Sequence, residues 1–162
     1  MSIATLDEMR GSLGVLYQAW AGQRASDILI LPRAGSDRQY FRIGRPGPVV
    51  IGVYNPDRRE NEAFVAFSRH FHAMGAPVPE VYAQDLDNGV YLQQDLGDLS
   101  LLQFLEQERR GSEFPESALR LYGQSLAALA KLQIEGAEGI DWSLCQPRPA
   151  FDRQSMAWDL SY

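Results

Sequence analysis

Apolar residues recur at helical spacing at the start of the chain and again after residue 57. In the first segment they are Leu6, Met9, Leu13, Leu16, Tyr17 and Trp20. In the second they are Phe64, Phe67, Phe71 and Met74. Each segment opens on residues with the spacing of a capping box and ends at a glycine. The pattern therefore predicts two amphipathic helices, over about 6–21 and 58–74.

Short apolar runs bounded by turn residues predict about five strands. They cover 28–31, 39–43, 49–55, 78–84 and 90–94. The last two runs are separated by a segment that contains Asn88-Gly89, which is a strong hairpin signal. Because these runs follow one another through short turns, we expect an antiparallel sheet with a packed helix.

From residue 97 onward the apolar spacing is again helical. We expect helices over 100–109 and 115–134, and a further one that begins near Asp152. The last helix reaches Tyr162 without a glycine stop or a basic last turn. The sequence thus predicts an α+β fold, and we expect the natural protein to continue beyond Tyr162.

The first hairpin contains a small polar turn flanked by arginines. Gly35 and Ser36 lie in this turn, where small residues let backbone N–H groups approach an anion. Arg33, Arg38 and Arg42 add positive charge beside it, and arginine binds phosphate or carboxylate in a planar fork. Two interpretations remain open at this point, an ordinary solvated hairpin and a phosphate-binding turn.

Composition excludes several classes of function. The formal net charge of −6 argues against a general nucleic-acid binder. The single cysteine, Cys145, excludes an internal disulfide, and the single lysine, Lys131, excludes a P-loop after a strand. His70 and His72 lie two residues apart on a helix and cannot clasp one metal ion. No signal peptide or membrane span is predicted, so we expect a cytoplasmic protein.

The order of these elements is similar to that of the small lobe of a kinase. The chain resembles the aminoglycoside phosphotransferase family of small-molecule kinases, and within it the bacterial amino-sugar kinases. The residues that carry the resemblance are 34–42, 77–81, 91–97 and 153–160. The resemblance implies a nucleotide-binding lobe over 1–96, with the hinge, and the truncated start of a helical large lobe over 97–162.

The resemblance also implies the residues of an ATP site. Gly35 and Ser36 would cover the phosphates, and Arg38 or Arg42 would add charge. Asp95 and Leu96 would be the hinge, with the C=O of Asp95 and the N–H of Leu96 bonding the adenine edge. Two further groups complete the expectation, which are the adenine-pocket walls Leu31, Phe41 and Val50 and the helix acid Glu62. The alternatives are that the three apolar residues belong simply to the core of the sheet and that Glu62 is a solvent-facing helix acid.

The sequence departs from the kinase pattern in two ways. Aligning 49–52 with the strand that ends in the phosphate-binding lysine puts Gly52 in the place of that lysine. No catalytic loop is present either, so we expect no catalytic residue and no metal ligand in this chain, and Mg²⁺ ligands beyond Tyr162. A polypeptide of these residues alone is expected to be inactive.

We therefore expect the ATP-binding part of a phosphotransferase that acts on a sugar or amino-sugar hydroxyl. The alternatives are a non-catalytic module that binds a nucleotide or a partner, and a purely structural interaction domain. The expected partners are a nucleotide and a sugar acceptor, with no nucleic acid and no membrane. If the chain is truncated, apolar faces after Pro115 should be exposed and should promote self-association.

Overall fold

A computed structural model describes residues 4–32, 35–44, 47–109, 114–146 and 148–161. Its centre is a five-stranded sheet with the order β1-β2-β3-β5-β4, in which every pair of neighbours is antiparallel. The strands are β1 (Asp27–Ile30), β2 (Gln39–Gly44), β3 (Val50–Tyr54), β4 (Val81–Asp85) and β5 (Val90–Gln94). The predicted α+β class and antiparallel sheet are confirmed.

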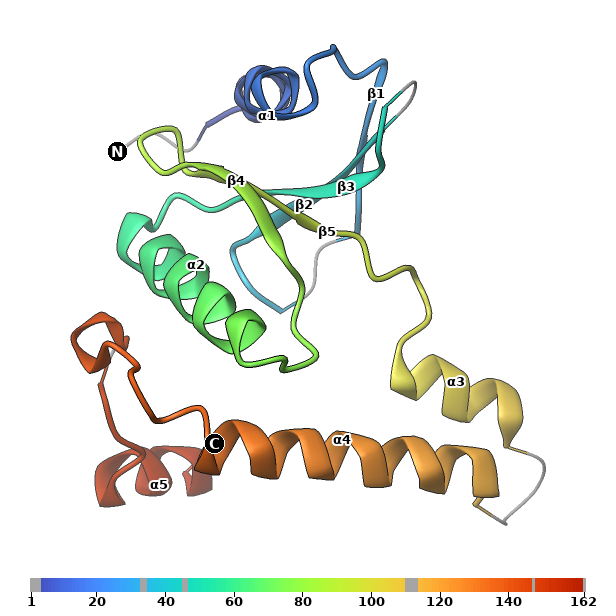
Figure 1. Cartoon of the computed structure of the whole chain (residues 1–162), viewed down its shortest axis with the longest axis vertical. Helices are drawn as coiled ribbons and strands as arrows, with labels where there is room; N and C mark the ends of the chain where they lie inside the picture. The colour runs from blue at the N-terminus through green and yellow to red at the C-terminus, as the bar shows by residue number, and fades with distance from the viewer. Residues whose placement is uncertain (1–3, 33–34, 45–46, 110–113, 147, 162) are drawn as a thin grey trace.

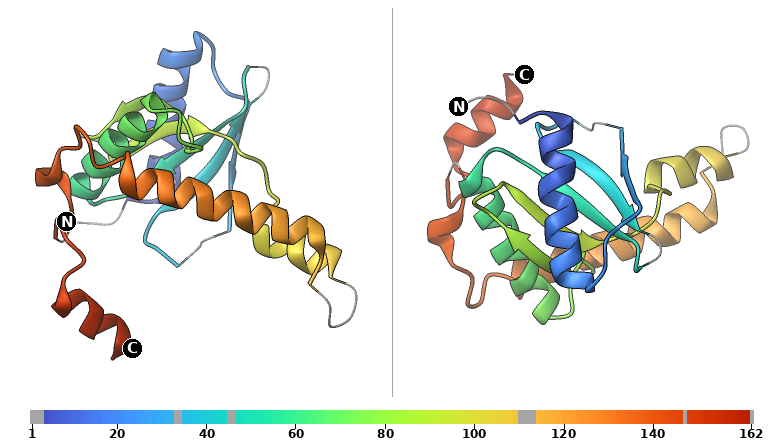
Figure 2. Two further views of the ribbon diagram at one scale, coloured as in Figure 1. Left: turned by 60° about the horizontal axis from the view of Figure 1, so that its bottom comes forward. Right: turned by 90° about the horizontal axis from the view of Figure 1, so that it is seen from above.

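Two helices cover the two faces of this sheet. Helix α1 (Leu6–Ala21) begins at a complete capping box between Thr5 and Glu8 and ends at Gly22, whose φ is 72°. Helix α2 (Arg58–Ala73) begins at Asp57, whose carboxylate accepts a hydrogen bond from the N–H of Glu60. Figure 1 shows α1 on one face of the sheet and α2 on the other, and seen from above α1 crosses the sheet (Figure 2).

The rest of the described chain is helical, as expected. Its elements are α3 (Leu101–Glu108), α4 (Glu116–Ile134), the short 3₁₀ helix η1 (Trp142–Leu144) and α5 (Arg153–Leu160). Helix α3 packs beside α4, and α4 lies on the same side of the sheet as α2 (Figure 1). Among the described residues, no helix combines the length and apolar character that crossing a bilayer would need.

Apolar side chains form a separate core on each face of the sheet. The core under α1 is made by Met9, Leu13, Tyr17, Phe41, Ile43, Val50, Tyr54, Val90 and Leu92. The core under α2 is made by Ile51, Val53, Val65 and Tyr91, with Leu31, Tyr40, Phe64 and Val81 packed against it. Since successive side chains of a strand point to opposite faces, β3 contributes alternate residues to the two cores.

Candidate functional site

The face of the sheet under α2 is the one that meets the helical part of the chain. At the end of α2, His70 Nε2 lies 2.9 Å from the carbonyl oxygen of Gly136, and Lys131 Nζ donates to the carbonyl oxygen of Met74 at 3.3 Å. Helix α2 also contacts η1. A ligand held between the sheet and the helical part would therefore lie on the α2 face, because α1 covers the other one.

On this face, an arginine at the start of β2 is paired with an acid of α2. Arg38 Nη2 lies 2.7 Å from Glu60 Oε1, and the Arg38 guanidinium carbon lies 5.3 Å from the centre of the Phe64 ring. Only 17% of the Arg38 side chain is exposed. A buried guanidinium is stabilised by such an ion pair and by the face of an aromatic ring. The pair joins the first hairpin to the helix.

A short network fixes the position of Glu60. Its second carboxylate oxygen accepts a hydrogen bond from Asn55 Nδ2 at 2.8 Å, and the carbonyl oxygen of Asn55 accepts one from Asn61 Nδ2 at 2.8 Å. The predicted capping box of α2 is therefore only half formed. Asp57 caps the helix, while the Glu60 side chain turns away from the cap to bind Asn55 and Arg38.

A buried phenol lies beside this pair. The hydroxyl of Tyr91 adjoins the Arg38 guanidinium, and burial raises the pKa of this phenol well above its usual value, while the charge of Arg38 and a hydrogen bond with it act in the opposite direction. The Tyr91 hydroxyl and Arg38 Nε are both buried. An arginine that is held in this way by an acid can also bind an anion such as a phosphate through its remaining N–H groups.

The predicted helix acid, Glu62, lies elsewhere. It accepts a hydrogen bond from Arg58 Nε of its own helix at 2.8 Å, and Arg58 also pairs with Asp87 of the β4–β5 hairpin. These are surface ion pairs of α2, because the side chains of Arg58 and Asp87 are 54% and 86% exposed. Glu62 thus pairs within its own helix, as a solvent-facing helix acid would, and the acid of α2 that pairs with the arginine before β2 is Glu60.

Gly52 does not occupy the position of a lysine that faces α2. A Cβ atom on Gly52 would lie 2.8 Å from Leu13 Cδ2 of α1 and 2.6 Å from Ile43 Cδ1. The residue therefore faces the core under α1, and the β3 residues that face α2 are Ile51 and Val53. The predicted alignment is wrong by one residue, which in a strand exchanges the two faces.

Two of the predicted adenine-pocket walls also face α1 and not α2. Phe41 is 0% and Val50 1% exposed, and both lie in the core under α1. Neither side chain can contact a ligand on the α2 face, so both predictions are wrong. Leu31 does pack against the core on the α2 side.

The predicted phosphate turn is described only in part. Gly35 and Ser36 lie in an exposed bend between β1 and β2, whereas Arg33 and Ala34 lie outside the described residues. The hairpin is closed below the turn, because the N–H of Leu31 donates to the carbonyl oxygen of Tyr40 at 2.9 Å and Gln39 Nε2 donates to the carbonyl oxygen of Leu31 at 3.0 Å. The role of Gly35 and Ser36 stays a prediction.

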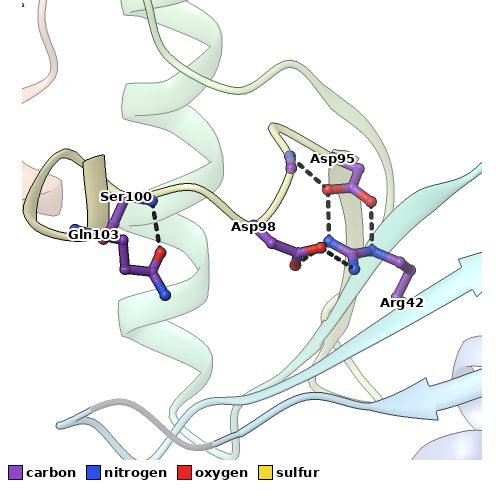
Figure 3. A network of polar contacts seen from close by, with 6 residues as sticks. Arg42, Asp95, Asp98, Ser100 and Gln103 are labelled. Carbon is purple, nitrogen blue, oxygen red and sulfur yellow. Dashed lines mark hydrogen bonds and ion pairs between the residues drawn. The ribbon is translucent and has the colours of Figure 1, made fainter. Parts of the chain in front are cut away.

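At the other end of β2, Arg42 binds two carboxylates of the segment that follows β5 (Figure 3). Its Nε and Nη2 donate to the two oxygens of Asp95 at 2.6 and 3.1 Å, and its Nη1 and Nη2 donate to Asp98 at 3.0 and 2.8 Å. Arg42 is thus held at the predicted hinge, and its charge is neutralised there. Arg38 is therefore the better candidate for binding phosphate.

The hinge prediction also needs a correction in its hydrogen bonds. The C=O of Asp95 and the N–H of Leu96 belong to one peptide group, and in a trans peptide these two bonds point in opposite directions. At most one of them can face an adenine ring. The N–H of Gly97 donates to Asp95 Oδ1 at 2.9 Å, so the Asp95 side chain shapes the backbone at this place.

The Asp95 ion pair predicts a pH dependence of stability. Hydrogen bonds from Arg42 hold the pKa of the Asp95 carboxyl below its usual value. A lowered pKa in the folded state adds stability at pH values above the pKa of the unfolded chain, and this stability is lost as the pH falls through the folded pKa. The free energy of unfolding in urea should therefore fall more steeply between about pH 6 and 3 for the wild type than for Asp95→Asn. Parallel profiles for the two proteins would contradict the ion pair.

Other parts of the described chain add no second candidate at this face. A cleft of about 820 Å³ lies between the start of α1 and the β4–β5 hairpin, and none of the predicted site residues lines it. No group of three or more His, Cys, Asp or Glu side chains that could hold a metal ion occurs among the residues that the structure describes.

Sequence comparison agrees with this geometry. The profile of the APH phosphotransferase enzyme family matches residues 27–162, which include the whole sheet and all helices after it. The chain belongs to this phosphotransferase family. Its N-terminal helix α1 precedes the matched region and covers the face of the sheet opposite the candidate site.

One curated relative gives a more specific comparison. The phosphotransferase chain is 26% identical over 144 residues to an N-acetylmuramate/N-acetylglucosamine kinase of Pseudomonas aeruginosa. This match covers 88% of the chain and 38% of the relative. The chain thus spans well under half the length of this kinase.

Proposed function

We propose that this chain is the ATP-binding part of a small-molecule phosphotransferase whose acceptor is a sugar or amino-sugar hydroxyl. The observation that carries the proposal is the Arg38–Glu60 pair on the α2 face of the sheet. Kinase-type enzymes orient the phosphates of ATP with a strand lysine that pairs with a helix acid, and here an arginine immediately before β2 pairs with an acid of α2. The acceptor class is supported by the name of the Pseudomonas aeruginosa relative.

In this proposal each group at the site has a separate task. Arg38, oriented by Glu60, binds the phosphates, and the backbone at Gly35 and Ser36 covers them. Leu31, which is only partly buried, offers apolar surface to the adenine ring, and the Asp95 peptide offers one hydrogen-bonding group to its edge. ATP supplies the phosphoryl group when it is bound. The Mg²⁺ ligands expected beyond Tyr162 stay a prediction, and no step is assigned to the metal.

A titration of ATP against the chain, followed by calorimetry, tests the first half of the proposal. We expect saturable binding of one ATP per chain. We also expect ADP, which carries the same base and two of the phosphates, to compete for this site. ADP release by the full-length protein in the presence of N-acetylmuramate or N-acetylglucosamine tests the second half. Binding without turnover on any sugar would favour the non-catalytic module, and no binding at all would favour the structural domain.

The exposed face of α4 leads to a prediction about association. The large apolar side chains of this helix that remain exposed are Leu119, Tyr122, Leu126, Leu129 and Ile134. Exposed apolar surface of this extent promotes contact with other apolar surface in water. We expect the apparent mass of the isolated chain in sedimentation equilibrium to rise with concentration, and Leu126→Glu, at 65% exposure, to reduce the rise. A concentration-independent monomer would contradict this.

A further inference from the structure

One side chain of the sheet, that of Arg42, donates hydrogen bonds to two residues of the segment between β5 and α3. Arg42 stands on β2, opposite Ile51 of β3, which is in turn opposite Gln93 of β5. Strand β3 lies between β2 and β5. The guanidinium of Arg42 therefore reaches across β3 to the residues that follow β5 (Figure 3). The two ends of this contact are 53 and 56 residues apart in the chain.

The two carboxylates that Arg42 binds differ in burial. Each carboxylate accepts two hydrogen bonds from Arg42 in a bidentate geometry, but the side chain of Asp95 is 15% exposed and that of Asp98 is 80% exposed. The less exposed pair is the stronger one, because water screens the exposed pair and competes for its hydrogen bonds. Asp95 is therefore the main anchor and Asp98 a weaker second contact.

The anchor is followed by backbone that is itself ordered by side chains. Asp95 also accepts the hydrogen bond from the N–H of Gly97, whose φ of 85° turns the chain. Ser100 and Gln103 then form a complete capping box at the start of α3. From Asp95 to the first turn of α3, side-chain hydrogen bonds thus fix the chain direction at two successive places. Arg42 is the contact that relates this direction to the sheet.

We propose that Arg42 is a positioning residue that sets the direction in which the chain leaves the sheet after β5, in addition to the contacts of α2 with the end of α4 and with η1. The name Arg42 tether denotes its contacts with Asp95 and Asp98. By holding Asp95, the tether also places the hinge peptide that the adenine edge would meet, and this part of the proposal rests on the proposed function. The tether itself does not depend on ATP.

Spin-label distances test the tether without any nucleotide. Labels at Ala19→Cys of α1 and Gln107→Cys of α3, both exposed positions, report the sheet and the helical part in a Cys145→Ser background. A narrow distance distribution is expected for the otherwise wild-type chain, and a broad one for Arg42→Gln. Equally narrow distributions would overturn the proposal.

Two substitutions of Asp95 separate the tether from the local turn. Asp95→Asn can still accept the N–H of Gly97 but loses the ion pair, whereas Asp95→Ala loses both. If the tether is the ordering contact, the distribution for Asp95→Asn should be as broad as that for Arg42→Gln, and Asp98→Asn should broaden it much less. A narrow distribution for Asp95→Asn together with a broad one for Asp95→Ala would assign the order to the turn and overturn the tether.

The matched control is Arg58→Gln, which removes another arginine that pairs with two carboxylates, Glu62 and Asp87, on the surface of α2. It should leave the distance distribution unchanged, and the unfolding temperature of Arg42→Gln should fall no further than that of Asp95→Asn, which loses the same ion pair. A clearly larger fall for Arg42→Gln would make Arg42 a packing residue and would overturn the positioning role.

ATP titration of the same variants connects the tether to the proposed site. If loss of the tether leaves the hinge in the binding position only a tenth of the time, the dissociation constant rises about tenfold. Arg42→Lys, which keeps the charge but not the fork, should recover part of this affinity. An unchanged affinity in Arg42→Gln would overturn the effect on the hinge. A wild-type chain that binds no ATP would instead contradict the proposed function, while the distance measurement would still decide on the tether.

Discussion

Replacing Arg38 by glutamine is expected to weaken ATP binding by about ten- to a hundredfold, because hydrogen bonds to charged groups contribute roughly 1.5–3 kcal/mol. Arg38 lies on the α2 face and is paired with a single acid, whereas Arg42 is paired with two. Glutamine can still donate one hydrogen bond to Glu60, but it carries no charge for a phosphate. Calorimetric titration with ATP gives the dissociation constants.

Arg58→Gln is the control for this prediction. Arg58 is also paired with carboxylates, but it faces the β4–β5 hairpin and is 54% exposed. We expect its substitution to change ATP affinity less than twofold, since surface ion pairs of this kind contribute about 0–1 kcal/mol and lie away from the site. Equal ATP affinities for the wild type and Arg38→Gln would show that Arg38 does not bind the phosphates. Equal losses in Arg38→Gln and Arg58→Gln would show only a general effect of charge.

Introducing a lysine at Gly52 is expected to destabilise the fold and not to improve ATP binding. The Cβ atom alone would lie within 3 Å of both Leu13 and Ile43, and the ammonium group would be driven into the core under α1. Overpacking of a core costs about 1–3 kcal/mol, and a buried unpaired charge adds several more. The free energy of unfolding in urea should therefore fall by about 3 kcal/mol or more for Gly52→Lys.

Gly52→Ala separates the steric part of this effect from the charge. Alanine adds only the Cβ atom, so its cost should be confined to the overpacking range of about 1–3 kcal/mol. Wild-type stability of Gly52→Lys would mean that residue 52 faces α2, and the alignment with the strand lysine would then be correct. A loss of the same size in both variants would show that sterics alone decide.

The sequence predicted the elements well because their signals are local. The capping box at Thr5, the Asn88-Gly89 turn and the helical spacing of apolar residues each depend on neighbours a few positions away. These signals were enough for the order of helices and strands and for the antiparallel sheet. These local signals predict the elements, but they do not predict which side chains meet across the sheet.

The faces of β3 could not be read from its sequence. Every residue from Val50 to Tyr54 is buried, because α1 covers one face of the strand and α2 the other. Such a strand lacks the alternation of polar and apolar residues from which its two faces are recognised. The misplacement of Gly52 and Val50 follows from this lack of a signal.

The two ionic contacts of the site were missed for a different reason. Glu60 has the spacing of a capping box, and the sequence contains nothing that says its carboxylate will prefer Asn55 and Arg38 to the backbone of its own helix. Arg42 and Asp95 are 53 residues apart, so their pairing is a result of the sheet order. Long-range contacts of charged side chains leave no periodic pattern.

Because Glu60 binds Arg38 and does not close the capping box of α2, the positive charge of the candidate site comes from a residue outside β3. The middle of β3 only packs, against the cores on both faces of the sheet. Changes at Arg38 or Glu60 can therefore adjust affinity for an anionic ligand without disturbing the interior of the sheet. Mutational libraries at these two positions should contain many folded proteins with altered binding, whereas libraries at 51–53 should contain few folded ones.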